Sequence, residues 1–270
     1  MGDRAPLGEF LRNRRGRIGP AEVGLPAGTG RRQLPGLRRA ELAALAGVSV
    51  DYYVRLEQGR DTNPGSGVLD ALAGALRLDD DERVHLHRLA QRPRPRVATA
   101  PPTGVQYGLR QLVQAIRPAP AYLLDATGTI VAANPEGDRL MVGLAGWPAA
   151  RRNIIRYVFA HPAAREVFGN WAEIAEDCVA DLRTVAAADP RSPDLAALVS
   201  ELSATSAEFA ALWRRYDVRV NRGGRRRFRH PVAGAFELTS EVLAAADGRR
   251  LLIFHAPPGS PGHHAVRLLG

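Results

Sequence analysis

The sequence predicts an α+β protein in which an all-α domain of five helices precedes a domain built on an antiparallel sheet. Three observations lead to this fold class. The chain has 270 residues, a length that suits two ordinary domains. Apolar residues recur every three to four positions in the first 91 residues, which is typical of amphipathic helices. Short apolar runs at residues 121–133 and 236–256 instead have the length of strands.

A proline-rich segment divides the two domains. Residues 92–102 contain four prolines and almost no apolar side chains, a composition typical of linkers. We therefore expect a helical domain over residues 1–91 and a sheet domain over residues 103–260. Residues 261–270 are expected to form a C-terminal tail.

The first domain is predicted to contain five short helices. Ser49 is placed to cap the third helix, which should end at Gly59. Ser66 is placed to cap the fourth, and the acidic run 79–82 lies in the first turn of the fifth, where negative charge is stabilising. The apolar positions of the five helices cluster at residues 7–11, 37–46, 53–56, 69–76 and 84–89.

The second domain is predicted to alternate strands and helices. Gly128 suits a hairpin turn between two strands. Asn170 is placed to cap a helix with Glu173 reaching back to it, and Thr205 with Glu208 matches the capping-box pattern at the start of another helix. Two strands, several helices and three further strands predict an antiparallel sheet with helices packed on one side. The expected helices cover residues 105–116, 171–185 and 207–215, and the expected strands cover residues 121–125, 129–133, 217–220, 236–242 and 251–256.

The positive charge is concentrated near the N-terminus. All 37 basic side chains are arginines and the net charge is +9. Residues 1–60 hold 11 arginines against 6 acidic residues, whereas residues 61–100 hold 6 of each. A localised basic face indicates a polyanionic partner, although a solvated arginine-rich surface is the alternative.

Several classes of protein are excluded by what the sequence lacks. The single Cys178 cannot form an internal disulfide or a multi-cysteine zinc site, and the chain has no apolar run of about 18 residues. No nucleophile with an identifiable base and no spaced carboxylate pair stands out, so no catalytic or metal residue is assigned. We expect a cytoplasmic protein that is neither an enzyme nor membrane-bound.

Residues 38–60 contain the most specific pattern. Leu42, Ala43 and Ala46 give one helix a small apolar face, Gly47 permits a tight turn, and Val48 fills the corner. This pattern resembles the helix-turn-helix of the phage-repressor (Cro-like) and xenobiotic-response-element regulators. A second helix of this kind fits the major groove of DNA.

Side-chain chemistry then suggests roles on the second helix. Arg55 can bond guanine or hold a phosphate, Asp51 can accept from cytosine, and Val50 can touch a thymine methyl. Arginines flanking the helices are expected to bind phosphates. The candidate DNA-binding residues are Arg38, Arg39, Ser49, Val50, Asp51, Tyr52, Val54, Arg55 and Arg60.

The resemblance becomes narrower over the whole chain. The string from Gly47 to Arg60, together with Trp213-Arg-Arg-Tyr-Asp-Val218 and Phe228-Arg-His-Pro231, resembles the actinobacterial MmyB-like transcription regulators. That family joins a helix-turn-helix domain to a PAS-like ligand-binding domain and is associated with fatty acids or similar acyl ligands. Tyr216 stands where His is expected, and Pro257 where an acidic residue is usual.

The resemblance implies a sensory pocket in the second domain, with an apolar tail among aromatic side chains and an Arg or His near the mouth. The alternative is that these aromatic residues form the hydrophobic core of the domain and line no pocket. The run from Arg225 to Arg229 suits a carboxylate site, a DNA contact, or a solvated loop or strand edge. The candidate ligand-binding residues are Leu123, Ile130, Asn134, Phe168, Trp171, Phe209, Trp213, Phe228 and His230.

The sequence therefore predicts a homodimeric, sequence-specific transcription regulator that binds a double-stranded operator and senses a small apolar molecule, without a cofactor. Two alternatives stay open. The second domain is a dimerisation module without a ligand, or it is a small-molecule enzyme tethered to the regulator.

Overall fold

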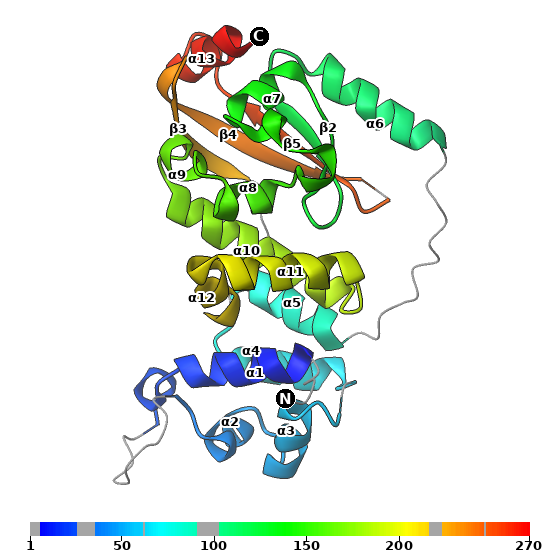
Figure 1. Cartoon of the computed structure of the whole chain (residues 1–270). Helices are drawn as coiled ribbons and strands as arrows, with labels where there is room; N and C mark the ends of the chain where they lie inside the picture. The colour runs from blue at the N-terminus through cyan, green and yellow to red at the C-terminus, as the bar shows by residue number, and fades with distance from the viewer. Residues whose placement is uncertain (1–5, 26–35, 62, 91–102, 216–222, 246) are drawn as a thin grey trace. The chain divides into compact units, whose positions relative to one another are not determined.

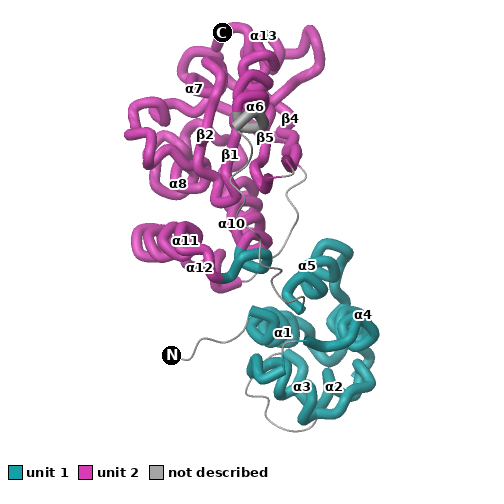
Figure 2. Tube along the Cα trace, turned by 90° about the vertical axis from the view of Figure 1, so that its right-hand side faces the viewer, with its two compact units in different colours: residues 1–96, 186–190 teal, residues 97–185, 191–270 magenta. Residues whose placement is uncertain are grey.

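The computed structural model of the chain describes residues 6–25, 36–61, 63–90, 103–215, 223–245 and 247–270 (Figure 1). The chain divides into two compact units, residues 1–96 with 186–190 and residues 97–185 with 191–270 (Figure 2). The expected linker 92–102 and the expected strand 217–220 lie outside the described residues. Within the described ranges, no helix is long and apolar enough to cross a membrane.

The described residues of the N-terminal part form the five expected α-helices and one short 3₁₀ helix. Leu7, Phe10 and Leu11 of the first helix are buried in its core. The expected cap at Ser66 is wrong by one residue, because Gly65 is the N-cap and Ser66 begins the helix. The elements are α1 (Pro6–Arg17), η1 (Pro20–Val23), α2 (Arg39–Leu45), α3 (Val50–Glu57), α4 (Ser66–Ala75) and α5 (Asp80–Ala90).

The C-terminal domain is built on a five-stranded sheet in the order β2-β1-β5-β4-β3, and every neighbouring pair is antiparallel. The basic run 225–229 forms most of β3, which lies at one end of this order, so the run is part of an edge strand and not of a loop. The strands are β1 (Ala121–Leu124), β2 (Ile130–Ala133), β3 (Gly224–His230), β4 (Gly234–Ala244) and β5 (Arg250–His255).

More helices accompany the sheet than the sequence predicts. The expected helix over residues 207–215 has the bounds found for α12, but its cap is Ser206, whose Oγ accepts a 3.1 Å hydrogen bond from the amide of Phe209. The hydroxyl of Thr205 instead donates to the carbonyl of Glu201. The helices are α6 (Thr103–Ala115), α7 (Pro135–Leu140), η2 (Leu144–Gly146), η3 (Ala149–Arg151), α8 (Ile154–Ala160), α9 (Ala164–Val167), α10 (Trp171–Ala188), α11 (Pro193–Thr205), α12 (Ala207–Arg215) and α13 (Pro261–Leu269).

Helices cover both faces of the sheet, so the expectation of helices on one side only is wrong. Along β1, Ala121 and Leu123 share a buried cluster with Val113 of α6. Tyr122 lies between them in sequence and so faces the other way, toward the side that α7 to α10 cover. Strand β1 is buried at all four positions because both of its faces are covered.

The turn before α10 is bound to β3. The amide of Gly169 donates to the carbonyl of Arg227 at 2.7 Å, and Oδ1 of Asn170 accepts from the amide of Arg227 at 3.1 Å. The side-chain nitrogen of Asn170 donates to Glu173 at 2.7 Å. Asn170, predicted as a helix cap, thus joins the start of α10 to the sheet.

Residues 261–269, expected in a tail, form helix α13. The hydroxyl of Ser260 caps it by accepting from the amide of His263, and Ala265, Val266 and Leu269 are buried. Gly262 approaches β4 so closely that a Cβ there would overlap the carbonyl oxygen of Glu237. The C-terminal segment is therefore part of the folded domain.

Candidate DNA-binding surface and ligand cavities

The α2 and α3 helices form a close-packed helix-turn-helix. Leu42, Ala43 and Ala46 are buried, as their small apolar face predicts. Gly47 has a φ of 65°, a left-handed conformation that glycine adopts readily, and the amide of Val48 returns to the carbonyl of Ala43 at 3.0 Å. The turn fixes the start of α3 relative to α2.

Helix α3 separates a buried face from an exposed one. Oγ of Ser49 accepts a 3.2 Å hydrogen bond from the amide of Tyr52, which confirms the predicted cap. Tyr53 and Leu56 are fully buried, whereas Val50 is 43% exposed. The helix is thus anchored along one side and presents the other to solvent.

The exposed face carries most of the predicted DNA-binding side chains. Asp51 and Arg55 are exposed, and Tyr52 and Val54 are half-buried. The guanidinium of Arg55 lies 5.5 Å from the centre of the Tyr52 ring, a cation–π distance. Arg38 and Arg60, at the beginning of α2 and after α3, are also exposed.

A buried carboxylate fixes the end of α3. Glu57 is 2% exposed and pairs with Nε of Arg15 at 2.9 Å and with Nη2 of Arg39 at 2.7 Å. Burial acts to raise the pKa of Glu57, but the hydrogen bonds from Arg15 and Arg39 outweigh it, so the pKa lies below its ordinary value. Arg39, a predicted phosphate contact, thus already pairs with Glu57. The Arg39 side chain is nevertheless 46% exposed.

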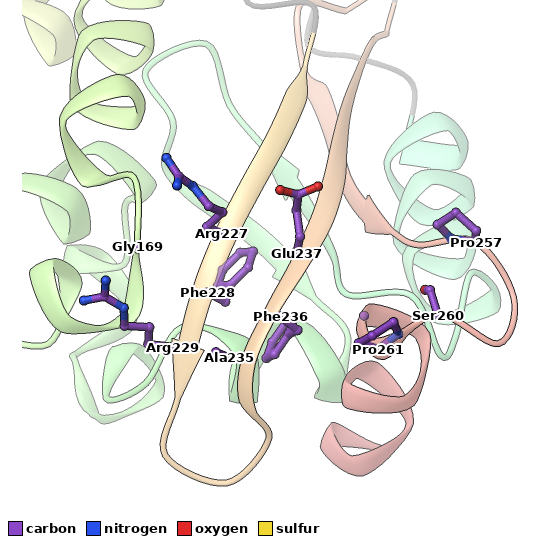
Figure 3. Close-up of a pocket in the computed structure, with 11 residues that line it drawn as sticks. Gly169, Arg227, Phe228, Arg229, Ala235, Phe236, Glu237, Pro257, Ser260 and Pro261 are labelled. Atoms are coloured by element: carbon purple, nitrogen blue, oxygen red, sulfur yellow. The ribbon is translucent and has the colours of Figure 1, made fainter.

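One cavity in the C-terminal domain is a groove of about 560 Å³ along the β3–β4 hairpin (Figure 3). The pairs Arg227–Glu237 and Arg229–Ala235 lie opposite each other on the exposed face of the two strands. In Figure 3, Arg227 and Arg229 lie toward Gly169, and residues 257–261 border the other side. The lining residues are Gly169, Arg227, Phe228, Arg229, Ala235, Phe236, Glu237, Pro257, Ser260, Pro261 and Gly262.

This groove combines apolar surface with cationic side chains. Its exposed apolar side chains are those of Ala235, Pro257 and Pro261, whereas the stacked rings of Phe228 and Phe236 are only 1% and 7% exposed and face the core. Arg229 is exposed, and Arg227 makes a long 3.8 Å ion pair with Glu173. Such a lining can hold an elongated molecule with an apolar part and an anionic end.

A smaller cavity, of about 50 Å³, lies inside the domain between the sheet and α10. Its polar residues are not among those predicted from the sequence. Side chains alternate between the two faces of β3, so Arg226 points inward, as the buried Phe228 does. This alternation is the sequence signal from which an inward-facing Arg226 could be predicted. The lining residues are Met141, Ile154, Val158, Phe168, Ile174, Asp177, Cys178, Arg226, Ser240, Leu252 and Phe254.

Cys178 is a buried thiol in this lining. Desolvation by burial raises its pKa to about 12, with a further rise from Asp181. The thiol therefore stays protonated at neutral pH and acts as a small apolar filler. Among the residues that the structure describes, no group of three or more His, Cys, Asp or Glu side chains is arranged to hold a metal ion.

Two of the predicted ligand-binding residues line one of these two cavities. Phe228 lines the groove, and Phe168 lines the interior cavity. Leu123 lies in the cluster beneath α6, and Ile130 is half-buried in β2.

The two polar candidates stabilise the fold. Oδ1 of Asn134 accepts from the amides of Ala121 and Gly137, which ties β1 to the start of α7. His230 bonds the carbonyl of Arg139 through Nε2 and accepts from the amide of Val232 through Nδ1.

The remaining aromatic candidates pack against each other. Phe209 and Trp213 stack at 5.8 Å, and Phe159 contacts both Phe209 and Trp171. The guanidinium of Arg165 lies 3.8 Å from the centre of the Trp171 ring. Trp171, Phe209 and Trp213 thus join three helices, α8, α10 and α12, and do not line either cavity described above.

Two family models match the chain. A model described as a helix-turn-helix domain matches residues 6–86. A model described as the MmyB-like transcription regulator ligand binding domain matches residues 105–269, more than half of the chain and including α13. A comparison with curated proteins found no match.

Proposed function

The chain belongs to the MmyB-like transcription regulators and is a DNA-binding regulator with a ligand-binding domain, and we propose that it acts as a cytoplasmic homodimer on a two-fold operator. The exposed face of α3 is the observation that carries this proposal. Val50, Asp51 and Arg55 project from a helix whose other side is fixed by Tyr53 and Leu56. A rigid helix with an exposed face of this width suits the major groove.

Selection from a random DNA library with the full-length protein tests this role. The expected result is an enriched motif with two related half-sites, about 10 base pairs from centre to centre or a multiple of that spacing. Fluorescence anisotropy on the enriched duplex and on a scrambled duplex then measures specificity at a fixed salt concentration. Equal affinity for the two duplexes at every salt concentration contradicts sequence-specific binding.

We further propose that the second domain binds a small apolar or acyl molecule, such as a fatty acid, in the groove along β3 and β4. Three features support this assignment. The volume of the groove, about 560 Å³, lies within the range of small-molecule binding sites. The exposed Ala235, Pro257 and Pro261 offer apolar surface, and Arg229 lies where an acid group would need a cation.

Native mass spectrometry, with organic extraction of the purified protein, tests for this ligand. The expected spectrum shows a dimer that carries one organic molecule per subunit. Ala235 is exposed on the groove floor, so Ala235→Trp fills the groove and is expected to remove the molecule without unfolding the domain. Val232→Trp, on the exposed hairpin turn outside the groove lining, is the matched control.

One observation favours a second candidate function. The cavity between the sheet and α10 measures only about 50 Å³, which is room for a few water molecules. A filled interior suits a dimerisation module that holds two DNA-binding domains together without a ligand. An apo dimer with full operator affinity, unchanged by added fatty acid, supports this alternative, and an apo monomer contradicts both proposals.

A further inference from the structure

Tyr52 and Arg55 lie about one turn apart on α3 and contact each other. The guanidinium carbon of Arg55 lies over the ring of Tyr52, 5.5 Å from its centre. Residues three apart on a helix project from the same side, so the contact follows from their spacing. Tyr52 is half-buried, whereas Arg55 is exposed. The domain therefore holds one partner of this contact, and the other extends into solvent.

The main chain at both residues is fixed by hydrogen bonds. The amide of Tyr52 donates to Oγ of Ser49 at 3.2 Å. The carbonyl of Arg55 accepts from the amide of Arg60 at 2.9 Å and from the amide of Asp61 at 3.3 Å, because the chain folds back on the helix after α3. The freedom that Arg55 retains thus lies in its side chain.

The side chain of Arg55 is held differently from those of Arg15 and Arg39. Both of these arginines donate N–H groups to the carboxylate of Glu57. Among the residues that the structure describes, the guanidinium of Arg55 meets an aromatic ring and no carboxylate. The N–H donors of a guanidinium lie in its plane, so a ring against its face leaves them available, whereas a carboxylate occupies some of them.

Available donors on a restrained side chain suit the recognition of a base. An arginine reads guanine by two parallel hydrogen bonds to O6 and N7, which require the guanidinium edge to face the base pair. A free arginine loses much rotamer freedom when it binds in this way. A ring that already restricts the guanidinium lowers this loss and so favours the base that Arg55 recognises.

We infer that Tyr52 is a positioning residue for base recognition: its ring holds Arg55 in the orientation that reads a guanine of the operator, and its hydroxyl is not required. The inference rests on the proposed DNA-binding role of α3 and adds a residue that determines specificity through another side chain.

Fluorescence anisotropy with the full-length protein tests the inference, on the selected operator and on duplexes that differ from it at single base pairs. Tyr52→Leu removes the ring and should weaken operator binding about two- to fivefold, the strength of an exposed cation–π contact. Discrimination should fall by the same factor at the base pair that Arg55→Ala affects, and stay unchanged at the others. Equal loss for every duplex would overturn the inference, because it is the result expected from a purely structural role.

Tyr52→Phe is the matched control, because it keeps the ring and removes the hydroxyl. Its affinity and its discrimination should stay within about twofold of wild type. A loss in Tyr52→Phe as large as that in Tyr52→Leu would overturn the inference, since the hydroxyl would then be the group that acts.

A double-mutant cycle shows whether Tyr52 acts through Arg55. If it does, Tyr52→Leu should cost no further affinity in a protein that already carries Arg55→Ala. Additive losses would overturn the inference. Arg38→Ala, at the beginning of α2, is the comparison, and its effect should add to that of Tyr52→Leu because the two residues act separately. Equal coupling to Arg38 would also overturn it, as a sign of general damage to the domain.

Circular dichroism checks that the variants fold, which is expected because Tyr53 and Leu56 supply the buried face of α3. Tyr52→Gln is a second variant without a ring, suited to a partly exposed helix position, and should repeat the result of Tyr52→Leu. Two kinds of failure are distinguishable. If wild type binds the operator and a scrambled duplex alike, the proposed function fails; if wild type discriminates but Tyr52 and Arg55 are not coupled, only this inference fails.

Discussion

Gly8 of α1 lies against the backbone of Glu57 at the end of α3, and a Cβ on Gly8 would overlap the carbonyl oxygen of Glu57. The two helices thus touch through their backbones at the point where the buried Glu57 carboxylate also pairs with Arg15 of α1. Contact at this point holds α3 in place from behind, on the side away from its exposed face.

Gly8→Ala should therefore destabilise the N-terminal domain. Overpacking of this kind costs about 1–3 kcal/mol, and the obstacle here is backbone that cannot rotate away. Gly16→Ala is the matched control on the same helix, because no atom lies within 4 Å of a Cβ built there. Alanine should leave stability unchanged at Gly16 or raise it by up to about 1 kcal/mol. Urea unfolding followed by circular dichroism measures both, and equal effects would contradict the close contact.

Glu57→Gln should remove a stabilisation that depends on pH. The folded pKa of Glu57 is lowered from 4.5, so its contribution is present above that pH and is lost as pH falls through the folded pKa. Loss of one partner of a buried pair costs about 3–5 kcal/mol at pH 7, since Arg15 is left unpaired. The difference in unfolding free energy between wild type and variant should shrink below pH 4.5. Glu9→Gln, at an exposed position of α1, is the control.

Ser49→Ala should weaken the start of the recognition helix. The hydroxyl satisfies the amide of Tyr52, and loss of such a cap costs about 0.5–2 kcal/mol. Ser66→Ala tests the same substitution at the first residue of α4, where Gly65 is the cap, and should change stability by less than about 0.5 kcal/mol. Thermal unfolding of the two variants compares them directly, and similar losses would show that neither effect comes from capping.

Arg55→Ala and Arg60→Ala should differ in their effect on DNA binding. If Arg55 reads a base from the exposed face of α3, its loss costs about 1–3 kcal/mol and relaxes preference at one operator position. Arg60, beyond the end of α3, should bind phosphate, so its loss weakens all duplexes alike and lowers the salt slope by about 1. Anisotropy titrations on single-base operator variants at several salt concentrations measure both. A uniform loss for Arg55→Ala would reassign it to the phosphates.

The sequence predicts local features better than distant ones. The turn at Gly47, the cap at Ser49 and the buried face of α3 depend on neighbouring residues, and all three are as expected. The prediction of a tail over residues 261–270 is wrong, because residues 261–269 form helix α13, whose Gly262 contacts β4. That contact joins residues far apart in the chain, but the segment also has local helix signals, because Ser260 caps it and its buried residues 262, 265, 266 and 269 recur every three to four positions.

The cavity linings were harder to predict for a related reason. Trp171, Phe209 and Trp213 have the apolar character of pocket residues, but which aromatic side chains meet each other depends on how α8, α10 and α12 cross. Arg226 is in a run of arginines, and only the register of β3 distinguishes it from its exposed neighbours. Composition therefore predicts which kinds of side chain line a cavity, whereas the register of the strand determines which particular residue faces it.

The contact of Gly169 and Asn170 with Arg227 also bears on how copies of this protein meet. A strand at the end of a sheet offers unpaired backbone groups that can recruit a strand from another molecule and start aggregation. At Arg227 both backbone groups are already occupied from within the chain. Two copies cannot extend the sheet past Arg227 without first displacing the turn before α10, so the domain is protected against sheet-to-sheet polymerisation at this point of β3.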